Sequence, residues 1–73
     1  MEPFEIAFEL RQHGLRQADV AMRLGVAHAS VNNVIHRRAT SYRIASYIAG
    51  VLNREVNVLW PGQYESKPRT TQR

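Results

Sequence analysis

The chain has 73 residues, with ten Lys or Arg against six Asp or Glu, a formal net charge of +4 and no cysteine. A chain of this length supports one small domain and leaves little room for a deep catalytic cleft. The lack of cysteine excludes disulfides, thiolate zinc sites and cysteine nucleophiles.

The positive charge is concentrated in one block. Residues 1–10 carry three acids and no base, whereas residues 11–43 carry Asp19 as their single acid and six arginines: Arg11, Arg16, Arg23, Arg37, Arg38 and Arg43. Such a block attracts polyanions, because each neutralised phosphate releases counterions. A solvated charged surface would account for the same composition. The block therefore favours a nucleic-acid partner but needs a motif to support it.

A first helix is predicted from Pro3 to His13, because proline suits the first helical position and apolar residues then recur at helical spacing. Gly14 should end it in a left-handed cap, with Leu15 packing back on the helix. The start of the chain lacks the pattern of a secretory signal, and no stretch approaches membrane-spanning length. A cytoplasmic, nucleoid-associated protein without membrane contact is expected.

Two short helices should meet at a tight turn. The second is predicted over residues 17–24, Gly25 ends it, and the third covers roughly residues 28–37. In the third helix one side is apolar, with Val31, Val34 and Ile35, and the other side carries Ala29, Asn32, Asn33 and His36.

The remaining elements complete an all-α, compact domain of four to five helices over residues 1–65. Thr40 or Ser41 should cap a fourth helix that buries Ile44, Ala45, Ile48, Val51 and Leu52. Asn57 should cap a last turn through Trp60. Four aromatic residues outside the basic block are assigned to the core or to an interface: Phe4, Phe8, Trp60 and Tyr64. Residues 66–73 are expected to form a flexible basic tail.

The spacing within residues 17–36 is typical of a helix-turn-helix. Ala21 permits a close helix crossing, Gly25 supplies the backbone freedom of the turn, and Val31 and Val34 fill the core. Helical hairpins without a DNA function can show the same spacing. The arginine block covers the same residues, however, and the two signals support each other.

The run Gln17-Ala18-Asp19-Val20-Ala21-Met22-Arg23-Leu24-Gly25-Val26 resembles the helix-turn-helix of lambda-repressor-like and Cro-like proteins. The later run Ile44-Ala45, Leu52, Val56 to Pro61 and Tyr64 is similar to the C-terminal half of Ner-like repressors of transposable phages and their bacterial relatives. This resemblance covers about residues 6–64. It implies a lambda-repressor-like helical fold and repression of a phage or prophage promoter, often the gene's own. The stretches 27–29 and 38–40 depart from the pattern, so the resemblance does not imply an operator sequence.

Site residues follow from the expected docking of a recognition helix in the major groove. Candidates for base contacts are His28, Ala29, Asn32, Asn33 and His36. Candidates for phosphate contacts are Arg16, Gln17, Ser30, Arg37, Arg38 and Arg43. The asparagines could instead be merely solvated, and the last three arginines could satisfy helix-end carbonyls. The spacing of His28 and His36 does not suit a shared metal, and His13 should bond the last carbonyls of its helix.

These inferences predict a sequence-specific transcriptional regulator without catalysis, cofactor, metal or small-molecule substrate. Its partner should be a double-stranded DNA operator, bound by two copies that pair in solution or on DNA. The alternative is a helical protein-interaction module, such as an adaptor or an antitoxin-like protein, for which the acidic first helix would be the cue. Strong salt dependence of binding would favour DNA.

Overall fold

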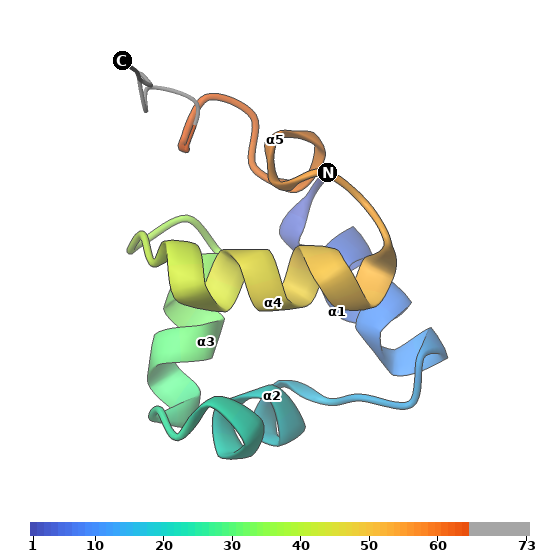
Figure 1. Ribbon diagram of the computed structural model, residues 1–73, viewed down its shortest axis with the longest axis vertical. Coiled ribbons are helices and arrows are strands. Elements are labelled where there is room, and N and C mark those ends of the chain that lie inside the picture. The colour runs from blue at the N-terminus through green and yellow to red at the C-terminus, as the bar shows by residue number, and fades with distance from the viewer. Residues whose placement is uncertain (65–73) are drawn as a thin grey trace.

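The computed structural model describes residues 1–64, which form five helices and no strand (Figure 1). These helices are α1 (Pro3–Gln12), α2 (Gln17–Leu24), α3 (His28–Ile35), α4 (Tyr42–Leu52) and α5 (Val56–Leu59). The predicted all-α helix-turn-helix class is thus confirmed. The tail predicted over residues 66–73 lies outside the described residues.

The core is built around α4, which crosses the middle of the molecule (Figure 1). α1, α3 and α5 each pack against it, and α2 packs mainly on α3. All five helices contribute buried apolar side chains, among them Ile6, Leu10, Val20, Ala21, Val31, Val34, Ile35, Ile44, Ile48, Leu52 and Leu59. Trp60 is completely buried, as predicted from the sequence, whereas Leu24 and Val51 are only half-buried.

The end of α1 follows local rules. Gly14 adopts φ +80°, and the Leu15 N–H donates to the Leu10 carbonyl at 2.9 Å, so the left-handed cap is confirmed. The last helical residue is Gln12. His13 stands just after it, and its Nδ1 lies 2.9 Å from the Glu9 carbonyl oxygen, the helix-end contact expected for this side chain.

α3 ends at Ile35, so the predicted end near Arg37 is wrong. Arg37 takes the left-handed conformation at φ 66°, and the Arg38 N–H donates to the Asn33 carbonyl at 2.8 Å. This closes a helix-end motif usually marked by glycine. Without a glycine there, the sequence carries no signal for the boundary.

The predicted cap of the last helix is also wrong. α5 begins at Val56 with Glu55 at its N-cap, and Asn57 is an exposed residue inside the helix. The helix ends at Leu59, one residue early, because the Trp60 backbone leaves the helical conformation where the indole enters the core.

Phe4 and Phe8 do not belong to the core, with 71% and 62% of their surfaces exposed. α1 buries Ile6 and Leu10, and at 100° per residue the two phenyl groups fall on the opposite side of the helix. Of their two predicted assignments, core or interface, the core assignment is therefore wrong.

Gly25 is required for its conformation and not for its size. Its φ is +70°, yet a Cβ placed there would meet no atom within 4 Å. Gly25→Ala should lower the free energy of unfolding by about 1–2 kcal/mol. Gly50, in the exposed face of α4, is the matched control, since Gly50→Ala should raise stability by up to about 1 kcal/mol. Urea titrations of both variants check the opposite signs. A loss of similar size in both would contradict this explanation.

Candidate nucleic-acid interface

α2, α3 and the three residues between them form the helix-turn-helix. Gly25 supplies the left-handed turn, and the Val26 N–H donates to the Ala21 carbonyl at 3.0 Å. The small Ala21 side chain is buried where α2 lies against α3. From this turn, α3 runs along one side of the molecule toward the start of α4 (Figure 1).

α3 has one buried face and one open face. Val31, Val34 and Ile35 are buried in the core. By helical spacing, the opposite face is centred on Ala29 and His36, which are exposed. The half-buried Asn32 and Asn33 flank this centre, whereas exposed His28 lies at the N-terminal end of α3, toward the start of α2. The structure thus places four of the five predicted base-contact residues on the outward side of α3 or at its C-terminal end, and His28 at its N-terminal end.

A hollow of about 350 Å³ adjoins one edge of this face. It joins the start of α2 to the start of α3 and is lined by Ala7, Leu10, Arg11, Arg16, Gln17, Ala18 and His28. The Asp19 carboxylate accepts the Arg16 backbone N–H at 2.9 Å, which fixes the first turn of α2. The next backbone N–H groups, on Gln17 and Ala18, belong to the helix end that favours anions. The predicted phosphate residues Arg16 and Gln17 therefore lie together beside His28.

Arg11 also lines this hollow, although it was not among the residues predicted to contact phosphates. Its side chain is exposed, and it lines the same hollow as Arg16. The sequence feature that could have identified Arg11 was its place in the arginine block. The block did not show, however, that the end of α1 lies next to the start of α2.

On the other edge, Ser30 and Asn33 line a hollow of about 290 Å³ with residues of the loop between α3 and α4, including Thr40 and Ser41. Arg38 Nε donates to Asn33 Oδ1 at 3.3 Å. The amide oxygen of Asn33 therefore already has a partner within the protein. No hydrogen bond to the Asn32 side chain occurs among residues 1–64.

Two of the arginines that follow α3 contact backbone carbonyls. Arg43 donates to the carbonyl of Leu24, the last residue of α2, at 2.7 Å, and Arg37 donates to the Met1 carbonyl at 2.6 Å. For Arg43 this is the helix-end alternative that the sequence had left open. Arg37, Arg38 and Arg43 remain exposed, so these bonds do not remove them from solvent.

The family model for winged helix-turn-helix DNA-binding domains matches residues 1–73. The chain belongs to this winged helix-turn-helix family. Residues 1–64 contain no strand, so the described part of this family member presents the helix pair without a β-hairpin wing. No curated protein and no solved structure matches the chain.

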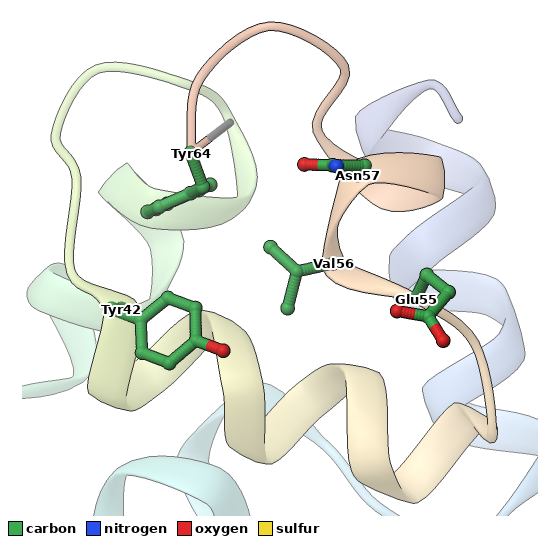
Figure 2. Close-up of a pocket in the computed structure, with 5 residues that line it drawn as sticks. All are labelled: Tyr42, Glu55, Val56, Asn57 and Tyr64. Atoms are coloured by element: carbon green, nitrogen blue, oxygen red, sulfur yellow. The ribbon is translucent and has the colours of Figure 1, made fainter. Parts of the chain in front are cut away.

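A different hollow, of about 410 Å³, lies between the start of α4 and α5. Figure 2 shows its lining of Tyr42, Glu55, Val56, Asn57 and Tyr64. α5 and α2 lie on opposite sides of α4 in Figure 1, so this hollow lies across α4 from α2. Its one charged lining residue is an acid, which does not suit a phosphate.

None of the helices within residues 1–64 is long and apolar enough to cross a membrane.

Proposed function

We propose that this winged helix-turn-helix protein is a sequence-specific transcriptional regulator that inserts α3 into the major groove of a double-stranded DNA operator. The open face of α3 carries the proposal. Its asparagine amides and imidazoles can hydrogen-bond base edges, and an asparagine amide can pair with adenine N6 and N7 together.

Phosphate contacts would flank this face on both edges. On one edge, Arg11, Arg16 and Gln17 surround the start of α2, where the helix dipole adds to the positive charge. On the other edge, Ser30 lies next to the loop after α3, and this loop carries Arg38. Such contacts fix the register of the protein on the duplex, and the base contacts supply specificity.

The similarity of residues 44–64 to Ner-like repressors supports a finer assignment, a phage or prophage repressor that can act on its own promoter. The eight-residue α3 spans too few base pairs to be selective alone, so two copies should occupy one operator. A helical protein-interaction module is supported less well. The sequence feature that favoured it was the acidic first helix, but one of the acids of this helix, Glu9, forms an ion pair with Arg54 within the chain.

The decisive experiment is a comparison of duplexes. Fluorescence anisotropy would measure binding of the full chain to duplexes selected from a random library and to unselected duplex of the same length. At least tenfold tighter binding to the selected duplexes is expected. Equal affinity for both would rule out sequence-specific regulation.

Arg11→Ala and Arg16→Ala should each weaken binding to every duplex alike. Each should also reduce the slope of log K against log salt by about one, because one fewer counterion is released. Arg54→Ala is the matched control, since this arginine pairs with Glu9 at 2.9 Å outside the hollow beside α2. Its slope should equal that of the unmodified protein. A slope unchanged by Arg11→Ala would remove Arg11 from the interface.

A further inference from the structure

We infer that two copies of the chain associate through the outward face of α1, with the helices antiparallel and Phe8 on the two-fold axis. The inference rests on the proposed function for its biological role, since that function places two copies on one operator. The contact surface itself is argued from the geometry of α1.

The outward face of α1 exposes the two phenyl groups of the chain side by side. Phe4 and Phe8 lie one helical turn apart, and with Glu5, Glu9 and Gln12 they line a shallow hollow of about 570 Å³. Scattered single apolar residues are normal on a surface, but adjacent aromatic rings mark a contact site. No described residue covers them.

The acids around the phenyl groups are engaged within the chain. Arg54 donates to both oxygens of Glu9, at 3.0 and 2.9 Å, and this bond holds the pKa of the Glu9 carboxyl below its usual value. Glu5 accepts the Glu2 backbone N–H at 2.8 Å in the first turn of α1. With the Glu9 charge paired and the exposed Glu5 carboxylate the one left unpaired among the acids that line the hollow, the face does not call for a strongly cationic partner. It suits an occupant with aromatic rings and one or two polar groups.

A second copy has this chemistry. In an antiparallel pair with Phe8 on the two-fold axis, a residue meets one of the second copy that lies on the same edge of the contact and about as far from position 8 in the opposite chain direction, because the helical rise is constant. By helical spacing, Phe4 and Arg11 lie toward one edge of this face, and Glu5 and Gln12 toward the other. Arg11 of the second copy then lies beside Phe4, where its guanidinium can contact the ring face. Gln12 of the second copy lies beside Glu5 and can donate to its carboxylate. The two copies of Arg11 stay about 9 Å apart along the direction of the helices, as do the two copies of Glu5.

The contact should be weak in solution. Two phenyl groups per copy bury far less than the roughly 1,200 Å² at the low end of stable interfaces. Two copies bound to adjacent half-sites face each other at a high effective concentration, which favours the same contact on DNA. Arg11 lies at the C-terminal end of α1 and lines the hollow beside α2, so the α1 face borders the proposed DNA-binding surface.

The lack of cysteine permits a direct test by cross-linking. The Phe8→Cys variant of the full chain is oxidised with a glutathione redox buffer, alone and with selected duplex, and dimer is quantified on non-reducing gels. Facing Cα atoms at the axis lie within disulfide reach. We expect at least tenfold more covalent dimer than for Met22→Cys, a control residue on α2 with 76% exposure. The double variant Phe4→Cys/Arg11→Cys should also form dimers, because these positions meet only between copies.

Equal cross-linking of Phe8→Cys and Met22→Cys, with and without DNA, would overturn the inference. A second readout is the cooperativity of binding to duplex with two half-sites, which Phe8→Glu should abolish while circular dichroism stays unchanged. Selective DNA binding without cross-linking would refute the interface and leave the proposed function intact. Cross-linking without selective DNA binding would support the interface and refute the proposed function.

Discussion

Trp60→Ala is expected to lower the free energy of unfolding by about 3–5 kcal/mol, the usual cost of removing a fully buried tryptophan. The indole is 0% exposed and packs edge-on against Tyr64, with ring centroids 6.0 Å apart. Tyr64 in turn accepts the Ser41 N–H at 3.1 Å, next to the start of α4. Losing the indole would thus loosen the segment after α5 and its link to α4. Urea unfolding followed by far-UV circular dichroism measures the loss, because Trp60 is the single tryptophan of the chain.

Met22→Ala serves as the control for Trp60→Ala. The Met22 side chain is 76% exposed in α2, so its removal should change stability by less than about 0.5 kcal/mol. Should Trp60→Ala cost less than about 1 kcal/mol, the segment after α4 would not be an integral part of the folded domain. For a chain of this size the expected loss is a large share of the total stability.

Asn32→Ala is expected to cost about 1–3 kcal/mol in binding to a selected duplex, a loss of roughly 5- to 150-fold, and to leave binding to random duplex unchanged. Bidentate recognition of adenine uses the amide oxygen and the amide nitrogen together. The Asn32 amide has no partner within residues 1–64, so both groups are available. Anisotropy titrations with selected and random duplexes measure the difference.

Asn33→Ala should cost less on the same selected duplex. Asn33 Oδ1 already accepts from Arg38 Nε at 3.3 Å, and this bond must break before the amide can contact a base in bidentate fashion. Two results would contradict this ranking of the asparagines. One is an equal loss for both variants on selected duplex, and the other is a loss from Asn32→Ala on every duplex.

The sequence by itself determined most of the helical framework, because the relevant signals act over four or five residues. The left-handed glycines at 14 and 25 and the Ser41 cap, whose Oγ accepts the Ile44 N–H at 3.3 Å, end or begin helices through their own backbone neighbourhoods. Helical spacing also identified the buried side of α3 and most of the buried residues of α4. The open face of α3 followed from the same spacing.

Residue types near the helix ends did not predict the end of α3 or the start of α5. No residue type marked the left-handed end of α3 at Arg37, and asparagine at position 57 was a better cap by type than Glu55. Ile35 and Trp60, which stand at the C-terminal ends of α3 and α5, are both completely buried in the core.

Only the tertiary structure decided which residues of distant segments meet. Arg37 binds the carbonyl of Met1, 36 positions away, and Arg43 binds that of Leu24, 19 positions away, so the arginine block is divided among several roles. The packing of α1 near α2 placed Arg11 in the hollow with Arg16 and Gln17. α1 has two apolar stripes on opposite sides, and a small core can bury only one. Packing buried the stripe of Ile6 and Leu10 and left Phe4 and Phe8 exposed.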